Sequence, residues 1–407
     1  MSRGDCGFAR QASDVISVRS IEIPTGPPEA RHAAMYEVVT QVVPQFRDAA
    51  TVDFKSSILS GGATNELFKV TRISTGEAVV FRVYGQGTDQ IIERDSEVFW
   101  QEQFLRTYGR CRNGLVYEFL AGFQPLQPNE LPAEVERIAR NLADLHVTAT
   151  LRSLFAFPYA TDATNHTQFV LADWTKTAFS SQTWALLHGR YGGDPDKAAR
   201  LNYYRENETK IRGFVDTLLN VITMKVSPWS PQVPCHNDLL GLNIMVDKQR
   251  SLGDDEAMRF IDFEYMRRNY CYFDAANHFN EYCGMECDWS KYPDAAIQRR
   301  FLSAYLRHAK QLSLTSNLTV DASRWTATAP STAGCVVSDR DVAVACALTN
   351  VLSLASNVKW GVWSVIQAST SVIDFDYLSY GKMRLQRAFD TSDTFFSQLD
   401  AALQSDE

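Results

Sequence analysis

The sequence predicts an α+β protein of two lobes, with a small, antiparallel, β-rich first lobe and a larger, mainly helical second lobe. Its 407 residues exceed the size at which a single hydrophobic core stops growing, so two lobes are expected. Short β-rich segments separated by glycine turns fill the first part of the chain, and long helical segments follow. We therefore expect a poorly ordered leader over residues 1–30, a first lobe over 31–121 and a second lobe over 122–407.

The first lobe begins with a helix near Arg31 and continues as an antiparallel meander. Three segments rich in β-forming residues are separated by glycine-containing turns, which is the pattern of consecutive hairpins. They cover residues 54–59, 66–73 and 78–84. Helical spacing of apolar residues then predicts a helix over 90–106, and strand character returns over 114–120.

The second lobe contains long helices and one β-hairpin. Residues 132–148 carry an apolar stripe at helical spacing, and residues 341–369 predict a second long helix. Between them, two short apolar segments at 244–246 and 259–263 predict the strands of a hairpin. The Ser/Thr/Ala-rich stretch 313–338 lacks periodicity and predicts an exposed excursion.

The composition excludes several classes of protein. Hydrophobic residues make up 45% of the chain and charged residues 22%, values typical of a folded globular protein rather than a disordered or fibrous one. The formal net charge of -8 disfavours nucleic-acid binding, because contact with a phosphate backbone needs an excess of Lys and Arg on one face. A cationic ligand is electrostatically easier to bind.

The cysteines indicate a reducing compartment, and the apolar residues indicate that the chain does not cross a membrane. The eight cysteines are scattered, without a CxxC pair or a histidine at the spacing of zinc ligands, so we expect reduced thiols. No apolar run approaches the roughly 20 residues that span a bilayer, and the N-terminus lacks a secretory signal pattern. We therefore expect a cytoplasmic protein without a transmembrane segment.

The most informative motif combines two acidic residues with one amide. It runs from His236 through Asp238 to Asn243, and Asp262 follows at the end of an apolar strand. Phosphoryl transfer needs a carboxylate that accepts the proton of the substrate hydroxyl, and oxygen ligands that hold magnesium against the phosphates. The spacing from Asp238 to Asn243 equals that of the protein-kinase catalytic loop, and Asp262 stands where that family has the aspartate of D-F-G. We expect Asp238, Asn243 and Asp262 to converge on a metal-bound triphosphate.

By itself, the His-Asn-Asp sequence is also typical of a turn, because Asn and Asp cap and bend the backbone. The second acidic motif and the β-rich first lobe favour the kinase interpretation. Asn237 replaces the arginine that protein kinases have at this position. His236 is expected to support the loop rather than act as a base, since an imidazole can hydrogen-bond to backbone and orient the aspartate.

The first lobe carries a fixed cation at Arg82, on the strand where protein kinases have their phosphate-pairing lysine. Strand arginines are usually solvated, but the context of the lobe favours a phosphate contact. Glu97, on the following helix, is the expected ion-pair partner, with Glu93 as a rival. The run of small residues that ends at Asn65 offers backbone N–H groups to phosphate, although a Gly-Gly hairpin turn has the same pattern.

Taken together, these motifs resemble the choline/ethanolamine kinase family over nearly the whole length from about Phe54 to Phe389. The resemblance is carried by residues 59–68, 81–85, 235–238 and 261–281, of which the last segment is the most specific. It implies a bilobal, protein-kinase-like fold and transfer of a phosphoryl group from Mg-ATP to choline or ethanolamine, the first committed step toward the corresponding phospholipid. It also leaves a homodimer open.

The resemblance also implies roles for individual residues. These are a catalytic base, two magnesium ligands, contacts with ATP, and a pocket for the amino alcohol. The base is Asp238; the magnesium ligands are Asn243 and Asp262; ATP contacts are Arg82, Asn65, Glu118 and Leu120, the last two at the hinge that meets adenine; and the pocket contains Tyr265, Glu281, Trp360, Trp363, Phe375 and Tyr380. A cation held by one carboxylate and several aromatic faces gains roughly 0.5 to 2 kcal/mol per ring.

Three alternatives to this interpretation stay open. Trp360 and Trp363 lie one helical turn apart, and such a pair is more often ordinary core than part of a ligand cage. Aminoglycoside-type kinases share the H-x-D-x-x-x-x-N loop, but they favour an open, acidic cleft over paired tryptophans. A kinase fold that serves only as a binding module would have lost Asp238, Asn243 or Asp262, and all three are present.

The choice between ethanolamine and choline depends on the enclosure of the ammonium group. A primary ammonium donates hydrogen bonds, whereas a trimethylammonium depends on aromatic enclosure. After Glu281, the chain lacks the second downstream tyrosine that choline kinases tend to carry, and residues 113–120 and 373–378 look more like ethanolamine kinases. The sequence favours ethanolamine, with choline or both substrates as the alternative.

Overall fold

The computed structural model describes residues 15–59, 65–85, 92–153, 165–250, 254–315 and 336–404. The chain divides into two compact units: unit 1 is Met1–Gly122 with Ile261–Glu264, and unit 2 is Phe123–Phe260 with Tyr265–Glu407. Residues 261–264, which the sequence analysis counted in the second lobe, thus belong to unit 1. The reason is local packing, because the ring of Phe263 stacks on that of Phe104 at 4.9 Å.

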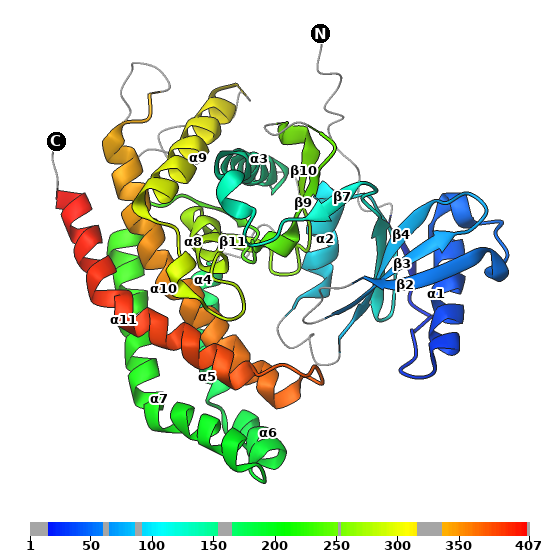
Figure 1. The fold of residues 1–407 in the computed structure, drawn as a ribbon, viewed down its shortest axis with the longest axis horizontal. Helices are drawn as coiled ribbons and strands as arrows, with labels where there is room; N and C mark the ends of the chain where they lie inside the picture. Colours follow the sequence, from blue (N-terminus) through cyan, green and yellow to red (C-terminus); the bar gives the residue numbers. More distant parts are fainter. Residues whose placement is uncertain are drawn as a thin grey trace. The chain divides into compact units, whose positions relative to one another are not determined.

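Unit 1 is built on a six-stranded sheet with the strand order β1-β5-β6-β4-β3-β2, and α1 covers one face of it (Figure 1). All neighbouring strands are antiparallel except the edge pair of β1 and β5, which is parallel. The elements are β1 (Ile16–Val18), α1 (Pro28–Val42), β2 (Phe54–Leu59), β3 (Asn65–Arg72), β4 (Ala78–Tyr84), α2 (Arg94–Phe104), β5 (Thr107–Cys111) and β6 (Gly114–Glu118).

The predicted meander of three strands is confirmed in β2, β3 and β4, whose bounds lie within one residue of those expected. Side chains alternate between the two faces of β4. Phe81 and Val83 belong to the hydrophobic core that contains Met35 and Val39 of α1, so the alternation points the intervening Arg82 to the opposite face. The strand pattern therefore positions a cation on the face that lies away from α1.

Part of the predicted leader is structured, which corrects the leader boundary at residue 30. Strand β1 pairs with β5, and Val18 and Ile23 are buried in the core of unit 1. Neither β1 nor β5 was predicted, because β5 holds few β-forming residues. Gly109 of β5 is required by close packing, since a Cβ there would lie 2.5 Å from the Cβ of Val42.

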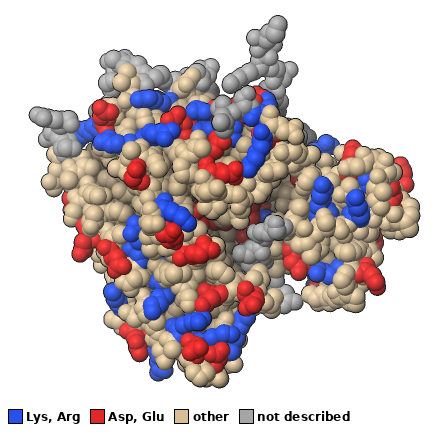
Figure 2. All heavy atoms as spheres, viewed as in Figure 1, with Lys and Arg blue, Asp and Glu red and all other residues tan. Residues whose placement is uncertain are grey.

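Unit 2 is mainly helical, and α3, α8, α9, α10 and α11 make up most of its core (Figure 1). Basic and acidic side chains are interspersed over its visible face (Figure 2). The elements are β7 (Phe123–Pro125), α3 (Val135–Ser153), α4 (His166–Phe169), α5 (Thr175–Ala178), α6 (Ser181–Tyr191), α7 (Pro195–Val221), β8 (Gln232–Cys235), β9 (Ile244–Asp247), β10 (Met258–Phe260), β11 (Arg267–Tyr270), α8 (Tyr272–Glu281), α9 (Ala295–Thr315), α10 (Asp339–Thr370) and α11 (Tyr377–Gln404).

The predicted hairpin of the second lobe is confirmed as the antiparallel pair of β9 and β10, to which β7 adds a third strand. Strand β10 ends at Phe260 rather than at residue 263, because the following four residues join unit 1. A second antiparallel pair, β8 with β11, was not predicted. Residues 236–243 connect β8 to β9 and carry the predicted catalytic motif.

Helix α10 is the central helix of unit 2. It begins with a capping box, in which Ser338 and Asp341 each accept a hydrogen bond from the other's backbone nitrogen. By length and composition α10 could cross a membrane, a candidate that the sequence analysis did not find; 83% of its most apolar 18-residue window is buried inside the fold. Packing against α8, α9 and α11 accounts for its apolar composition.

Helices α10 and α11 approach each other closely where two glycines face one another. A Cβ on Gly381 would lie 2.6 Å from the hydroxyl oxygen of Tyr204 and 2.9 Å from the carbonyl oxygen of Gly361. Because the carbonyl oxygen of Gly361 belongs to the helix backbone and the Tyr204 side chain is fully buried, only glycine fits here without a shift of the neighbours. This contact fixes α11 against the segment of α10 that carries the predicted tryptophan pair.

We predict that Gly381→Ala lowers the free energy of unfolding by about 1–3 kcal/mol, the usual cost of overpacking. Urea denaturation of the purified protein measures the change. Gly213→Ala is the matched control, because Gly213 lies on the exposed side of α7 with no atom within 4 Å of an added Cβ. The control should gain roughly 0.5–1 kcal/mol from helix propensity. Equal stability of the two variants would contradict the close-packing interpretation.

Candidate active site

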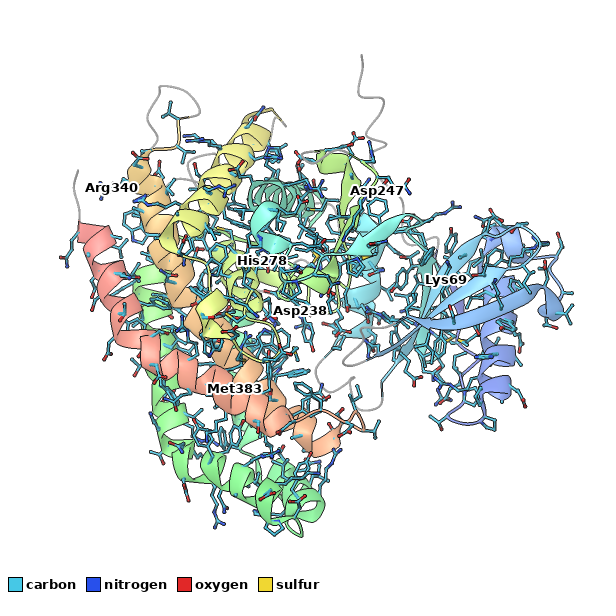
Figure 3. The ribbon with its side chains drawn as sticks, in the orientation of Figure 1. Lys69, Asp238, Asp247, His278, Arg340 and Met383 are labelled. Carbon is cyan, nitrogen blue, oxygen red and sulfur yellow. The ribbon has the colours of Figure 1, made fainter. Side chains whose placement is uncertain are left out.

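The catalytic loop, residues 236–243, brings two predicted site residues into contact, Asp238 and Asn243, of which Asp238 is labelled in Figure 3. The side-chain nitrogen of Asn243 donates to the backbone oxygen of Asp238 at 2.9 Å and lies 3.4 Å from its carboxylate oxygen Oδ2. Asp238 is half-buried and Asn243 is buried. The ring nitrogen Nδ1 of His236 accepts a hydrogen bond from the backbone nitrogen of Asp238 at 3.3 Å, so the imidazole contacts the loop backbone.

Asn237 holds the turn that precedes Asp238. Its φ of 63° lies in the left-handed region, which asparagine tolerates better than most residues. Its side-chain nitrogen donates to the backbone oxygens of Cys235, Tyr265 and Arg267, and its side-chain oxygen accepts from Asn269 at 2.7 Å. An arginine, which only donates, could not make this set of contacts. The departure from the protein-kinase motif is therefore structural.

Asp274, at the start of α8, is the buried anchor of the catalytic loop. Its two carboxylate oxygens accept from the backbone nitrogens of His236 and Asn237, each at 2.7 Å. His146 lies 2.9 Å from the same carboxylate and 2.7 Å from the hydroxyl of Tyr305. Burial raises the pKa of Asp274, but hydrogen bonding to His146 and Asn237 outweighs it and lowers the pKa below its ordinary value.

Cys235 lies close to this anchor. Together, Cys235, His146 and Asp274 form a buried group of residue types that can bind a metal ion. Burial raises the pKa of the Cys235 thiol well above its ordinary value. A zinc ligand must be a thiolate, and both other members of the group already have hydrogen-bond partners. The group therefore supports the loop.

A second residue of α8, His278, also holds the loop. Its Nδ1 donates to the backbone oxygen of Leu239 at 3.2 Å, and burial lowers its pKa to about 4, so the ring is neutral. Asp274, His278 and Glu281 share one face of α8, because they are four and three residues apart. One helix face thus carries two loop supports and a predicted substrate ligand.

The predicted phosphate contact, Arg82, lies at the centre of a buried charge cluster in unit 1. Its guanidinium pairs with Glu97 at 2.7 Å, with Asp262 at 2.6 Å and with Glu264 at 3.7 Å. Arg94 adds a second cation, 2.8 Å from Glu97. Burial lowers the pKa of Arg82, but the carboxylate of Asp262 more than compensates and raises it above the ordinary value.

Asn65 contacts the same cluster, because its side-chain nitrogen donates to Glu264 at 2.8 Å. Its side-chain oxygen accepts from the backbone nitrogen of Gly85 at 3.3 Å. Burial and the neighbouring Asp262 raise the pKa of Glu264 to about 7. The predicted magnesium ligand and the predicted ATP contacts Arg82 and Asn65 therefore lie within one hydrogen-bonded group. The glycine-rich run before Asn65 lies outside the described residues.

The predicted hinge positions lie at the end of β6. Glu118 is the last residue of that strand, and its carboxylate accepts from the backbone nitrogen of Arg106 at 2.8 Å. Leu120 follows the strand and is half-buried. The strand predicted to residue 120 thus ends two residues earlier, and Leu120 lies in irregular backbone, where its N–H and C=O are not used by the sheet.

The predicted amino-alcohol pocket is a continuous cluster of aromatic rings in unit 2. The ring of Trp360 lies 5.6 Å from that of Tyr265 and 5.3 Å from that of Trp363, both in edge contact. Tyr377, which the sequence analysis missed, continues the cluster toward Phe375 at 4.9 Å. Tyr380 follows, 5.7 Å from Phe375. The predicted aromatic residues therefore belong to one cluster.

Polar groups fix the orientation of these rings. The indole nitrogen of Trp360 donates to Asn277 of α8 at 2.7 Å. Among the described residues, the buried indole nitrogen of Trp363 has no hydrogen-bond partner. Glu281 accepts from the fully buried Arg384 at 3.1 Å, so this carboxylate already has one cationic neighbour. The cluster contains both apolar faces and polar groups, as a small cationic ligand requires.

Besides Tyr377, four further residues of this region were not predicted as site residues: Asp274, His278, Arg384 and Lys359. The signal for Lys359 was present, since a lysine in the apolar segment before Trp360 is unusual for a buried helix. Asp274 and His278 lie within residues 261–281, the most specific segment of the family resemblance, but their contacts and those of Arg384 have no local signal, because the partners are distant along the chain. Asp274, for example, binds residues 37 and 38 positions away.

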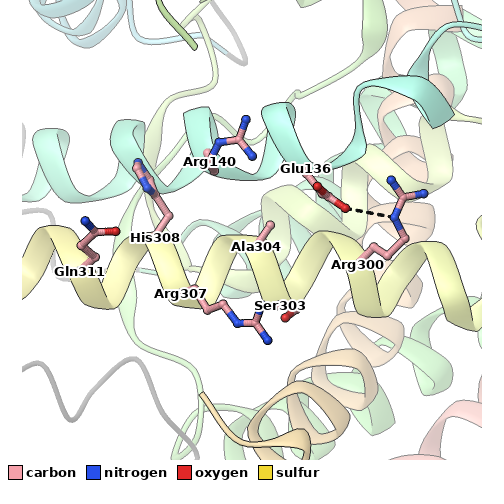
Figure 4. A pocket seen from close by; sticks show the side chains of 8 residues that line it. All are labelled: Glu136, Arg140, Arg300, Ser303, Ala304, Arg307, His308 and Gln311. Carbon is pink, nitrogen blue, oxygen red and sulfur yellow. Dashed lines mark hydrogen bonds and ion pairs between the residues drawn. The ribbon is translucent and has the colours of Figure 1, made fainter. Parts of the chain in front are cut away.

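A hollow of about 420 Å³ lies between α3 and α9, and no predicted site residue lines it (Figure 4). Two of its arginines pair with carboxylates: Arg300 lies 3.2 Å from Glu136, and Arg140 contacts Asp255 through two nitrogens. The lining residues are Glu136, Arg140, Arg300, Ser303, Ala304, Arg307, His308 and Gln311.

Comparison with known proteins agrees with the motifs. The family described as choline/ethanolamine kinase matches residues 56–389. The chain belongs to the choline/ethanolamine kinase family. It is therefore a kinase, and the predicted family is confirmed.

Two curated relatives and one solved structure show how far this kinase resembles known proteins. It is 28% identical over 376 residues to probable ethanolamine kinase A of Dictyostelium discoideum, covering 89% of this chain and 92% of that protein. It is 30% identical over 346 residues to ethanolamine kinase 1 of Mus musculus, covering 82% of each. The structure of an ethanolamine kinase of Plasmodium vivax matches with a TM-score of 0.64 at 22% identity, covering 93% of both chains. The predicted bilobal, protein-kinase-like fold is confirmed.

We predict that Asp274→Asn weakens both stability and turnover. Asparagine is neutral and has one acceptor oxygen where the loop uses two, so one buried backbone N–H loses its acceptor and the other loses a charged one, at a cost of about 2–4 kcal/mol. Urea denaturation and kcat measure the two effects. Asp255→Asn is the control, because that carboxylate forms a half-exposed pair with Arg140 and should cost less than about 1 kcal/mol. A variant at Asp274 with the wild-type urea midpoint would refute the anchor.

Proposed function

We propose that this kinase transfers the γ-phosphoryl group of ATP to the hydroxyl of ethanolamine, giving phosphoethanolamine and ADP. The observation that carries the proposal is the contact of Asp238 with Asn243 on a buried, anchored loop, in the same compact unit as the aromatic cluster and Glu281. The relatives named ethanolamine kinase support the choice of acceptor. The reaction is the first committed step of phosphatidylethanolamine synthesis.

In the proposed reaction, the substrate hydroxyl attacks the γ-phosphorus while the bond to the leaving ADP oxygen breaks. Asp238 accepts the hydroxyl proton. Its carboxylate is kept in orientation by the amide of Asn243 and by its own backbone contact with His236. Since phosphoryl transfer needs little covalent help from protein, such positioning is the main contribution of the loop.

The donor set fits magnesium, which prefers oxygen ligands. The side-chain nitrogen of Asn243 is engaged by Asp238, which leaves its oxygen as the ligand atom. Asp262 uses one carboxylate oxygen for Arg82, and its other oxygen can serve the ion. Magnesium would neutralise the phosphate charge, with Arg82 as a further cation. We assign the two ligand roles to Asn243 and Asp262.

The ammonium group of ethanolamine is proposed to bind at Glu281, next to the aromatic cluster. A primary ammonium can donate hydrogen bonds to the carboxylate, and it can rest on an aromatic face. Glu281 is shared with Arg384, so it offers part of a charge rather than an isolated one. Hydrogen bonding would therefore decide the orientation of this substrate.

Choline is the second candidate, and the ring cluster favours it. Its trimethylammonium group cannot donate hydrogen bonds and would depend on the faces of Tyr265, Trp360 and Trp363. Because one or two methyl groups in a pocket give limited discrimination, some turnover of both substrates is expected. The preferred substrate is the one with the larger kcat/KM.

We propose the cytoplasm as the compartment of this kinase. The cysteines among the described residues are free thiols, and all but Cys346 are buried, which suits a reducing environment. Cell fractionation tests this, with recovery in an oxidising compartment as the opposing result.

We predict ATP- and magnesium-dependent ADP release in the presence of ethanolamine, and a loss of about 10²–10⁴-fold in kcat for Asp238→Asn, the range expected for removal of a general base. A coupled assay of ADP release, run side by side with ethanolamine, choline and an aminoglycoside, measures both the substrate dependence and the change in kcat. The control is Asp247→Asn on β9: among the described residues this carboxylate accepts only from the nearby Gln249 backbone, so the variant should retain wild-type kcat. Release with the aminoglycoside alone, or full activity of Asp238→Asn, would refute the proposal.

A further inference from the structure

The aromatic cluster already contains a cation that belongs to the chain. Lys359 precedes Trp360 on α10 and is fully buried. Its ammonium nitrogen lies 4.4 Å from the ring centroid of Trp360 and 4.7 Å from that of Tyr265. These distances are within the range of cation–π attraction. Two of the rings assigned to the substrate ammonium are therefore in contact with an internal ammonium.

In the part of the chain that the structure describes, one hydrogen bond fixes this ammonium group. It donates to the backbone oxygen of Asn237 at 2.6 Å, one residue before Asp238. Among the described residues, Lys359 forms no ion pair with a carboxylate, so the aromatic faces supply much of its remaining stabilisation. The side chain thus has a defined position between the catalytic loop and the rings.

Lys359 is charged at neutral pH. Burial lowers its pKa to about 8, while the carboxylates of Asp238, Asp274 and Glu281 favour the protonated form. Protonation is also consistent with the hydrogen bond, because a carbonyl oxygen accepts from the ammonium group.

The internal cation affects the two candidate substrates differently. The faces of Tyr265 and Trp360 are partly satisfied by Lys359, and a second cation on them is repelled by the first. A primary ammonium can compensate through directional hydrogen bonds to a carboxylate or amide, whereas a quaternary ammonium has no donor and loses its main source of attraction. The position of Lys359 therefore disfavours the fully methylated substrate.

We propose that Lys359 is a specificity-determining residue, whose ammonium group occupies the aromatic faces of Tyr265 and Trp360 and thereby selects a primary over a quaternary ammonium in the acceptor. This inference rests on the proposed function, since it concerns the amino alcohol bound at that site. It differs from a purely structural role, which would change the turnover of both substrates by the same factor.

The test is the ratio of kcat/KM for choline to kcat/KM for ethanolamine in Lys359→Gln. Glutamine keeps a donor for the backbone oxygen of Asn237 and removes the charge. The ratio should rise about tenfold, as expected when the faces of two rings become available. Lys359→Met removes both charge and donor and should raise the ratio by a similar factor, even where its kcat falls.

Two matched variants separate specificity from loop support. Lys359→Arg keeps the charge and should keep the wild-type ratio. Asn269→Ala removes a different contact with Asn237, the 2.7 Å hydrogen bond to its side chain, and leaves Lys359 in place. It should lower kcat for both substrates equally, with the ratio unchanged. A ratio shift in Asn269→Ala as large as in Lys359→Gln would overturn the assignment.

A measurement on the wild-type protein covers the case in which the variants do not fold. Tetramethylammonium can bind only through aromatic faces, whereas ethylammonium can also donate hydrogen bonds. Tetramethylammonium should inhibit ethanolamine turnover at least about tenfold more weakly than ethylammonium. Equal inhibition, or an unchanged ratio in Lys359→Gln, overturns the role of Lys359 while the proposed function stands. Absence of turnover with either amino alcohol overturns the proposed function itself.

Discussion

The buried carboxylate of Asp274 is the interaction on which the catalytic half of this kinase depends. It accepts hydrogen bonds from two successive backbone nitrogens of a loop that carries a left-handed asparagine and a half-buried aspartate. Without an ionised acceptor, those two buried N–H groups would each be left with a large desolvation cost. His146 and Tyr305 in turn keep the carboxylate in place. The geometry of the loop is thus a consequence of one compensated buried charge.

Helix α10 connects this loop to the substrate region. Consecutive residues contact different parts of the site: Lys359 binds the loop backbone, Trp360 binds the α8 amide Asn277, and Gly361 permits the close approach of α11. A rotation of α10 would disturb all three contacts together. Helix α10 is long and apolar enough to cross a membrane. The same apolar composition allows it to be buried on all sides within unit 2.

Unit 1 also contains a buried charge that neighbouring charges must compensate. Arg82 is nearly fully buried, which is affordable only because Glu97, Asp262 and Glu264 surround its guanidinium. Asp262 is both a compensating charge and the assigned magnesium ligand, so the cluster orients it as it neutralises Arg82. Glu264 is buried among these charges with its pKa raised to about 7. The ion pairs that balance the charge of Arg82 therefore also determine the position of Asp262.

The sequence by itself determined the strands of the meander, the hairpin of β9 and β10, the long helices and the motif residues, because each depends on local periodicity or spacing. It also indicated the family, through the acidic motifs and the segment that ends at Glu281. Only the tertiary structure decided that Asp274, His278 and Arg384 support the site and that Lys359 lies among the rings. The tertiary structure also decided the pairing of β1 with β5 and the assignment of residues 261–264 to unit 1. The physical reason is that hydrogen bonds and ring contacts between distant segments follow from packing, which leaves no periodic trace in the chain.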